Sequence, residues 1–591
     1  MEDPSSGETP KPDKKLYSYI KRKQNDNPGI SPLKEHGKLV TDDKEKAEIL
    51  NRQFHSAFSL REEFSEEEFH LRCPMPPIPP TQTPLTNITI TVEGVKKLLL
   101  SLDPTKAPGP DSLSPRVLKE IAVELAPALT LLYQTSLNTG IVPSDWRTAN
   151  VSPVFKKGER YKPENYRPIS LTSILCKQME HIMVSNIMTY CENNSILCHQ
   201  QHGFRRGHSC ETQLLGFVDE VSKNLESGAQ EDLLVLDFSK AFDKVSHSLL
   251  THKLHQYGIS GNINKWIKAF LSDRKQTVVV NGASSEYVSV ESGVPQGSVL
   301  GPTLFLLYIN DLPDGLTSTP RLFADDTACH KKVKNSNDQS SLQNDLDKLA
   351  DWEKRWKMSF HPQKCSVVHM TRRLNSDIYP YHLHGHELGK EENVKYLGLT
   401  INRRLDWTPH IDNIVAKANR TLGFIRRNIK IPNQSLKQAA YRALVRPVLE
   451  YASPVWDPFT KENIQNIERV QRRASRWVCH RYRKTSSVEE MLEGLKWPSL
   501  SKRRKRARLS SFFKFHNGLT SITSKYLPTP SNRRRSNRRF NSQSYDINHS
   551  RTDYRQKSFF PRTIPEWNEL PDSTVSAPSL ASFQTRLAAS L

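Results

Sequence analysis

The 591-residue sequence contains no apolar run long enough to cross a membrane. The longest such stretch, around Val299 to Ile309, is interrupted by Gly301 and Pro302, whereas a membrane-spanning helix needs about 20 apolar residues. The N-terminus (MEDPSSGETPKPDKK) also lacks the apolar core of a signal peptide. We therefore expect an intracellular protein.

Cysteine is scarce, and the eight cysteines form no C-x-x-C pair. Their scatter favours neither a disulfide framework nor a zinc site. Cys191 and Cys198 lie near His199, but free thiols in a reducing compartment are the simpler interpretation. No internal repeat is found either.

Negative charge is in deficit, because 85 lysines and arginines face 63 acidic residues and leave a net charge of +22. A sequence pI near 9.5 indicates a polyanionic partner, for which nucleic acid and an acidic membrane surface are the candidates. The length allows several domains with cores of ordinary size.

Three acids stand in settings that suggest chemistry. Leu233–Leu236 has the pattern of a buried strand and ends at Asp237, while Arg321–Lys331 predicts a tight hairpin with Asp325 and Asp326 at its tip. Clustered carboxylates raise one another's pKa, and burial is costly without a cation. A hard cation such as Mg²⁺ resolves both problems, and a pair of such ions supports phosphoryl displacement. Three unrelated surface acids are the alternative.

Between these acids lies a loop rich in glycine and proline, Ser292–Pro302 (SGVPQGSVLGP). Glycine at these positions lets a ligand approach the backbone closely. Gln296 supplies a neutral donor and acceptor at the loop's apex, and Val299–Asn310 is predicted to be an apolar helix.

The segments LDFSKAFD, SGVPQGSVLGP and FADD occur in this order. Together they resemble the palm motifs of reverse transcriptases from non-LTR retrotransposons, of the jockey and CR1 type. The resemblance implies an α+β fold of the right-hand polymerase type, with fingers, a palm built on a small antiparallel sheet, and a helical thumb. It also implies RNA-directed DNA polymerase activity, in which two Mg²⁺ ions, or Mn²⁺, assist transfer of a nucleotide to a DNA 3′-hydroxyl.

The same resemblance assigns roles to individual residues. The implied catalytic and metal-binding positions are Asp237, Phe238, Asp325 and Asp326. The implied substrate-binding positions are Lys156, Arg167, Phe242, Gln296, Gly297 and Lys364.

Some of these roles have a simpler alternative, and in one the sequence departs from the family's motif. Lys156 and Arg167 would bind triphosphate oxygens, although each alone reads as ordinary surface charge. Phe242 would lie beneath the incoming sugar and exclude a ribose 2′-hydroxyl, or it is simply a core aromatic of the palm. Lys364 would protonate pyrophosphate, but the usual Asn-Pro pair before it is replaced by His361 and Pro362.

The chain is predicted to divide into four parts. Residues 1–86 hold a polar and partly helical segment, expected to be loosely ordered to Asp42 and helical over Asp43–Ser59, followed by a proline-rich linker. Residues 87–400 form the fingers and palm, 401–500 the helical thumb and 501–591 a basic C-terminal region. The linker prolines are Pro74, Pro76, Pro77, Pro79, Pro80 and Pro84.

Basic residues gather in the C-terminal half. The run Lys502–Arg508 (KRRKRAR) predicts a nucleic-acid patch or nuclear-localisation signal, with a solvated flexible stretch as the alternative. Basic residues in Gln201–Ser209 are expected near template or nucleotide. The thumb's outward faces carry Arg426, Arg427, Arg472, Arg473 and Arg476, and further clusters are Arg533–Arg535 and Arg538–Arg539.

The resemblance also implies which partners the protein binds and which domain it lacks. The expected partners are an RNA template, a DNA primer or target and deoxynucleoside triphosphates, with no membrane, in a ribonucleoprotein of the nucleus and cytoplasm. Relatives carry an apurinic-type endonuclease domain ahead of this region, which 86 residues cannot house, so its absence is predicted. A non-catalytic RNA-binding protein with a relic palm is one competing reading. A polymerase that makes RNA is another, disfavoured by Phe242.

Overall fold

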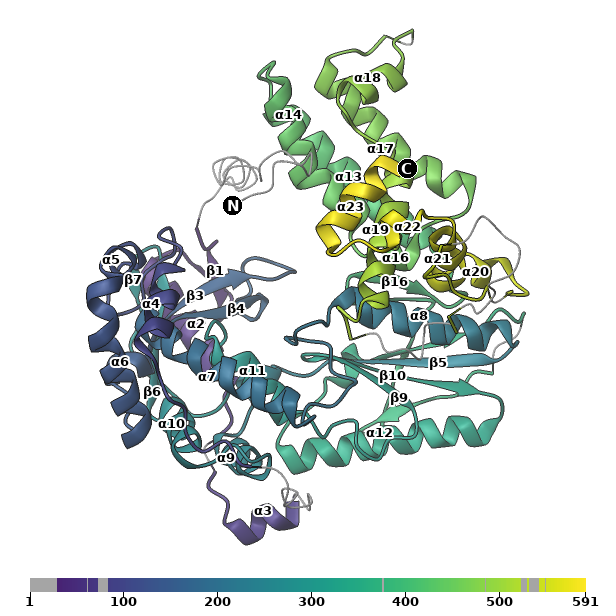
Figure 1. The fold of residues 1–591 in the computed structure, drawn as a ribbon. Coiled ribbons are helices and arrows are strands. Elements are labelled where there is room, and N and C mark those ends of the chain that lie inside the picture. Colours follow the sequence, from purple (N-terminus) through teal and green to yellow (C-terminus); the bar gives the residue numbers. More distant parts are fainter. Residues whose placement is uncertain are drawn as a thin grey trace.

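The computed structural model describes residues 29–60, 62–72, 83–374, 377–483, 485–521, 529–530, 541–547 and 549–590. Its helices and strands form an α+β right-hand arrangement (Figure 1), which confirms the predicted fold class. The fingers lie on the left of this view, the palm on the lower right and the helical thumb above the palm. Within the described ranges, no helix combines the length and apolarity needed to cross a membrane.

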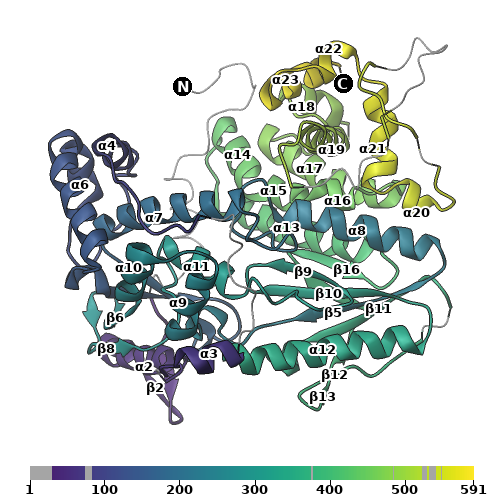
Figure 2. The ribbon, with the colours of Figure 1, turned by 60° about the horizontal axis from the view of Figure 1, so that its bottom comes forward.

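The palm is a five-stranded sheet in the order β14-β11-β5-β10-β9. Its strands are β14 (Gly389–Lys390), β11 (Ser366–Met370), β5 (Gln230–Leu236), β10 (Asp326–Val333) and β9 (Thr319–Phe323). Helix α8 (Cys210–Glu226) and helix α12 (Ser336–Trp356) cover opposite faces of this sheet (Figure 2). Leu233 and Leu234 of the central strand therefore join different hydrophobic cores, which explains the continuous apolar run.

The apolar stripe of helix α12 faces the palm core. All five of its large apolar residues are at most 5% exposed, so the stripe packs in the core and offers no surface for base stacking. They are Leu342, Leu346, Leu349, Trp352 and Trp356.

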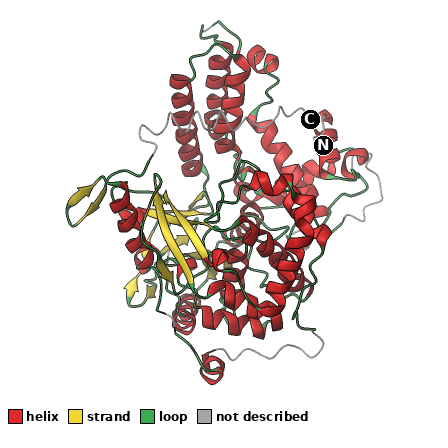
Figure 3. Ribbon diagram, turned by 90° about the vertical axis from the view of Figure 1, so that its left-hand side faces the viewer, coloured by secondary structure: helices red, strands yellow, loops and turns green. Residues whose placement is uncertain are grey.

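A second sheet forms the fingers, with β4 (Tyr166–Leu171), β3 (Thr148–Phe155), β6 (Arg274–Val280), β7 (Ala283–Ser284) and β8 (Val288–Val290). Asn281 and Gly282 form the hairpin turn between β6 and β7, with φ angles of 50° and 96°. Helices surround the sheet (Figure 3). They are α4 (Val92–Leu100), α5 (Pro115–Glu120), α6 (Ala122–Thr139), α7 (Ile174–Asn193), α9 (His247–Gln256), α10 (Gly261–Leu271) and α11 (Leu300–Tyr308).

The N-terminal segment packs onto the fingers. The prediction of loose order before Asp42 is wrong for residues 33–40, where β1 (Leu33–Glu35) and β2 (Lys38–Val40) form a hairpin. The physical reason is burial, because Leu33 is fully buried beside Val278 in a core shared with α2 (Asp43–His55). Helix α3 (Glu66–Arg72) follows. Residues 1–28 and the prolines Pro74, Pro76, Pro77, Pro79 and Pro80 lie outside the described residues.

The thumb and the C-terminal region share one hydrophobic core with helix α8. Two hairpins precede the thumb in the chain. The hairpin of β12 (His382–Leu383) and β13 (His386–Glu387) packs on the palm core, and that of β15 (Asn393–Tyr396) and β16 (Leu399–Asn402) joins the thumb core. The helices are α13 (Thr408–Asn428), α14 (Gln434–Ala440), α15 (Arg446–Glu450), α16 (Ser453–Trp456), α17 (Lys461–Cys479), α18 (Val488–Gly494), α19 (Leu500–His516), α20 (Asp553–Gln556), α21 (Phe559–Asn568), α22 (Asp572–Val575) and α23 (Leu580–Ser590).

The basic run Lys502–Arg508 lies within helix α19, so the prediction that it is a nucleic-acid patch or a solvated flexible stretch is wrong for Arg504 and Arg508. Arg504 and Arg508 are each 1% exposed and donate to Asp457, with nitrogen–oxygen distances of 2.6 and 3.1 Å. A spacing of four residues puts both guanidinium groups on one helix face, which here turns inward. The clusters Arg533–Arg535 and Arg538–Arg539 lie outside the described residues.

Asp457→Asn should destabilise the fold strongly, because the buried guanidinium group of Arg504 would lose its paired carboxylate, whereas Arg508 would keep Glu566. We expect the free energy of unfolding to fall by about 3–5 kcal/mol in a urea titration. Glu450→Gln is the matched control, since its partner Arg503 keeps 26% side-chain exposure and a solvated pair contributes about 0–1 kcal/mol. Equal losses in the two variants would contradict the structural role of Asp457.

Candidate active site

The strand register brings the three predicted acids to one end of the palm sheet. Leu236 of β5 pairs with Thr327 of β10, so one step further Asp237 lies opposite Asp326. Asp326 pairs in turn with Phe323 of β9, which leaves Ala324 and Asp325 as the turn. Side chains directly opposite on neighbouring strands share a face, with Cβ atoms about 4.5–5.5 Å apart. The predicted hairpin with carboxylates at its tip is therefore present.

Burial and the charge of neighbouring acids both raise the pKa of two acids in this cluster. Burial is the largest cause that raises the pKa of Asp325, and the charge of Asp237 raises that pKa further. The pKa of Asp326 rises to about 6, first through burial and then through the charges of Asp325 and Asp237. Lys156 and Arg167 oppose these shifts, which places the two cations within electrostatic reach of the acids.

Gln201 holds the acid turn, and sequence reasoning did not single it out. Its Oε1 atom accepts from the backbone N–H of Gly203 at 2.7 Å and from that of Ala324 at 2.9 Å. Ala324 has a φ of 55°, a left-handed conformation that is uncommon for a non-glycine residue. The buried amide thus fixes a strained turn. Only the fold reveals this contact, because Gln201 and Ala324 are 123 residues apart.

The chain leaving β5 pairs with a loop before β11. Ser239 donates its backbone N–H to the Ser359 carbonyl, and His361 donates to the Asp237 carbonyl, both at 2.8 Å. This pattern leaves the peptide groups of Phe238 facing away from Phe360. The same loop brings the Nζ atom of Lys364 to 3.5 Å from Asp237 Oδ2.

The two fingers cations lie at a pair of strands, Arg167 in β4 and Lys156 directly after the end of β3. Arg167 is opposite Val154 in the β3–β4 register, and the backbone N–H of Lys156 donates to Asn165 at 2.8 Å. Both cationic side chains are exposed. Desolvation is the main cause that lowers the pKa of Lys156, followed by the charge of Arg167, while the charge of Asp237 opposes the shift.

The glycine- and proline-rich loop is fastened to the segment after Asp237. Val294 donates its backbone N–H to the Phe242 carbonyl at 2.8 Å, and Ser292 Oγ donates to the Asp243 carbonyl at 2.7 Å. The side-chain amide of Gln296 donates to Asp243 Oδ1 at 2.8 Å. These bonds make Phe242 and Gln296 parts of one unit, and sequence reasoning missed Asp243 as its link.

Gly297 ties this loop to the fingers. Its φ is 115°, and a Cβ atom there would lie 2.6 Å from the Ser170 carbonyl oxygen. Ser170, in the strand that carries Arg167, donates its N–H to the Gln296 carbonyl at 2.7 Å. Any other residue at position 297 would be strained and would push this loop away from β4.

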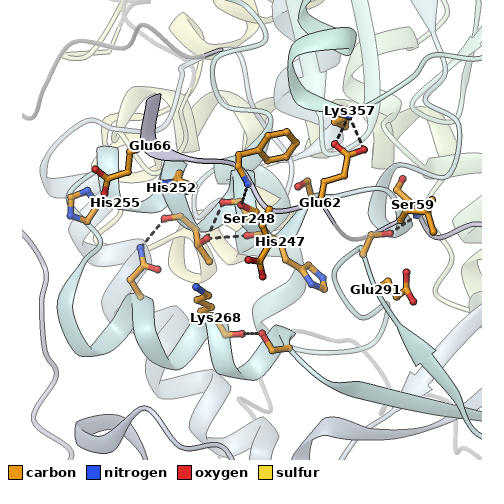
Figure 4. Close-up of a pocket in the computed structure, with 18 of the residues that line it drawn as sticks. Ser59, Glu62, Glu66, His247, Ser248, His252, His255, Lys268, Glu291 and Lys357 are labelled. Carbon is orange, nitrogen blue, oxygen red and sulfur yellow. Dashed lines mark hydrogen bonds and ion pairs between the residues drawn. The ribbon is translucent and has the colours of Figure 1, made fainter. Parts of the chain in front are cut away.

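The segment before the proline-rich linker contacts the glycine- and proline-rich loop Ser292–Pro302. A cavity of about 440 Å³ separates residues 59–60 and 62–66 from helices α9 and α10 (Figure 4). At its edge Ser59 donates its N–H to Ser292 Oγ at 2.8 Å, and Lys357 pairs with Glu62 at 2.7 Å. His247 Nε2 lies 2.7 Å from the Gly293 carbonyl oxygen. Residues on both sides of the predicted linker therefore contact the same loop.

Asp243→Ala should loosen Gln296 without removing a group from the acid cluster. A hydrogen bond to a carboxylate contributes roughly 1.5–3 kcal/mol, so we expect the KM for nucleotide in primer extension to rise about 10- to 100-fold. Asp243→Asn is the matched control, because its amide oxygen still accepts from Gln296. Equal KM values for the alanine variant and the wild type would contradict this role.

Some predicted nucleic-acid contacts are corrected or extended by the structure. Arg205 is not available to a template, because its guanidinium donates to both carboxylate oxygens of Glu192 at 3.0 and 2.9 Å and is 8% exposed. Arg206 is exposed. The thumb arginines Arg426, Arg427, Arg472 and Arg473 are exposed as predicted, and Arg476 is half-buried.

The donor set suits a divalent cation. The charge of Asp237 raises the pKa of Asp325 and of Asp326, so this cluster of hard oxygen donors is in need of positive charge. In the part of the chain that the structure describes, no three acidic, histidine or cysteine side chains already surround a metal position. The chemistry fits, and the carboxylates would have to draw together around an ion.

A palm sheet with clustered acids at one end, facing cations on a fingers sheet, defines the class of template-dependent nucleotide polymerases. Residues 154–401 match the family model described as reverse transcriptase (RNA-dependent DNA polymerase), so the chain carries a reverse transcriptase domain. That family implies an RNA template and a divalent metal ion.

The relatives narrow the class to non-LTR retrotransposons. The chain is 30% identical over 433 residues to the RNA-directed DNA polymerase from mobile element jockey of Drosophila melanogaster, covering 70% of this chain and 47% of the relative. It is 29% identical over 467 residues to the probable RNA-directed DNA polymerase from transposon BS of the same species, covering 75% and 50%. The chain spans about half the length of these curated relatives. The resemblance seen in the motifs is confirmed.

Proposed function

We propose that this protein extends a DNA 3′-hydroxyl on an RNA template, as the RNA-directed DNA polymerase of a non-LTR retrotransposon. The observation that carries the proposal is the register that sets Asp237 opposite Asp326, with Asp325 in the adjoining turn. Three acids at that place, facing Lys156 and Arg167 across the site, suit a reaction at a triphosphate.

Two Mg²⁺ ions, with Mn²⁺ as a substitute, would be held by Asp237, Asp325, Asp326 and the carbonyl of Phe238. When bound, such ions neutralise phosphate charge and activate a hydroxyl group. The support is the raised pKa values of Asp325 and Asp326 and the Phe238 peptide group, which faces away from Phe360.

The remaining residues would bind and orient the nucleotide. Lys156 and Arg167 bind its phosphate oxygens, and Lys364 protonates the departing pyrophosphate. Phe242 packs beneath the sugar, while Gln296 and Gly297 let the nucleotide lie against the loop backbone. These roles are supported by the resemblance of the motifs, by the effect of the Lys156 and Arg167 charges on the pKa of Asp325 and Asp326, and by the closeness of Lys364 to Asp237.

The thumb would hold the template–primer duplex. Its exposed arginines give sequence-independent attraction to phosphates. We assign residues 87–400 to fingers and palm, joined by the segment 29–60, and 401–500 to the thumb. The C-terminal region from 501 packs beside the thumb. In a cell such an enzyme would work in a ribonucleoprotein of the nucleus and cytoplasm.

Primer extension tests this function directly. The purified chain, given an RNA template, a DNA primer, deoxynucleotides and Mg²⁺, should lengthen the primer, and a chelator should abolish the reaction. A preparation that is folded and binds the RNA but never extends the primer, with Mg²⁺ or Mn²⁺, would refute the polymerase function.

A further inference from the structure

One exposed aromatic ring stands beside the acid turn without a role in the site described so far. Phe204 is 57% exposed and has a φ of 52°, a conformation that is strained for a bulky residue. Single exposed apolar side chains are common and need no explanation. An exposed ring with a strained backbone, on a rigidly held loop beside the acid turn, does require an explanation.

The loop that carries Phe204 is held on three sides. The preceding Gly203 lies so close to the acid turn that a Cβ atom would be 2.4 Å from the Ala324 nitrogen. The following Arg205 is fixed by Glu192, and its guanidinium also donates to the Cys198 carbonyl at 2.8 Å. The ring is therefore presented by a stiff support, so little entropy is lost when a ligand packs on it.

The loop lies on the thumb side of the acids. It leads directly into helix α8, and its Gly207 carbonyl accepts from the Ser521 N–H at 3.0 Å, just past the end of α19. Leu519, 55% exposed, lies at the same junction. The fingers cations, in contrast, come from β3 and β4, which Figure 1 shows across the molecule from α8 and α19.

We propose that Phe204 packs against a base or sugar of the template–primer duplex next to the primer's 3′ end. The proposal rests on the proposed polymerase function. An incoming nucleotide would lie toward Lys156 and Arg167, so a ring on the opposite side of the acids meets the strand that already ends there. Aromatic packing on nucleic acid tolerates any sequence, which suits a polymerase that must translocate. The exposed Arg206 adds a phosphate contact beside the ring.

Equilibrium binding of a chain-terminated DNA primer on an RNA template, without nucleotide, tests the contact. Phe204→Ala should raise the Kd roughly 5- to 100-fold for templates of different sequence. The slope of log Kd against log salt should stay unchanged, because no phosphate contact is lost. Phe204→Tyr should bind nearly as the wild type does. Tyr287→Ala is the matched control, since Tyr287 is 58% exposed on the fingers hairpin.

The outcomes separate cleanly. Wild-type affinity in Phe204→Ala would overturn the proposal, as would an unchanged Kd with a raised KM for nucleotide, which would move the ring to the nucleotide side. Failure of the polymerase function itself would appear in the wild type, as absence of primer extension. The melting temperature of each variant shows whether the fold is kept.

Discussion

Asp325→Asn is expected to lower the rate of primer extension by roughly 10³-fold or more while the fold and RNA binding persist. Loss of a single stabilising donor at a reaction centre already costs about 10²–10³ in rate, and a metal-binding carboxylate contributes more. The substitution keeps the shape of the side chain in the turn and removes only its charge. Single-turnover extension at saturating nucleotide measures the loss.

Stability provides the internal check on this variant. Burial raises the pKa of Asp325 in the fold, so folding disfavours its ionised form relative to the unfolded chain. For Asp326 the shift runs from the ordinary 3.8 to about 6, so the stability of the metal-free protein falls as pH rises through that window. Asp325→Asn should therefore melt no lower than the wild type at pH 7.

Two further observations would complete the case. Mg²⁺ should raise the melting temperature of the wild type more than that of Asp325→Asn, because ligand binding to the folded state stabilises it. Asp351→Asn, at an exposed acid of helix α12, is the control and should keep full activity. Wild-type extension by Asp325→Asn would remove this residue from the metal site.

The acid cluster was predictable because its signals are local. A continuous apolar run that ends in Asp237 and a two-residue turn at Ala324 and Asp325 fix strand ends, and ladder register then brings the acids together. Asp243 lies in the same short motif, yet its bond to Gln296 spans 53 residues, and nothing in the pattern distinguishes a buried carboxylate there from an exposed one.

The basic run in helix α19 shows the opposite case. Seven residues with six positive charges look solvated, since charged side chains are almost never fully buried unless they are paired. The pairing acid, Asp457, lies 47 residues before Arg504 and in another helix-bounded segment. Only tertiary packing decides which of the charges face inward. The composition of the run therefore could not predict that Arg504 and Arg508 are buried.

The prediction of loose order at residues 33–40 is wrong for the same reason, because the packing partners lie elsewhere in the chain. Its sequence is polar, and Leu33 is the one residue in it that is buried. The strand pairs are stabilised by packing on the fingers, through a backbone bond from Lys34 to the Tyr161 carbonyl at 2.8 Å. A segment that borrows its core from residues far along the chain carries little signal of its own.

Phe242→Val is expected to let the enzyme accept ribonucleotides roughly 100-fold more readily, equivalent to about 2.7 kcal/mol of transition-state discrimination. The Phe242 ring is half-buried and stacks on Phe305, with centroids 4.4 Å apart and planes 18° from parallel. Its carbonyl is held by the Val294 N–H, so the ring cannot retreat from an added hydroxyl. A clash in a packed site gives strong rejection.

Phe305→Leu separates the two roles of the ring pair. Phe305 is fully buried, so its truncation should lower stability, by about 1.5 kcal/mol or less for a shape change of this kind, and leave sugar preference unchanged. If Phe242 were only a core aromatic, Phe242→Val would instead lower the free energy of unfolding by about 2–4 kcal/mol with no change in sugar preference. Incorporation of deoxy- and ribonucleotides, measured beside the melting temperature of both variants, distinguishes a sugar gate from a core residue.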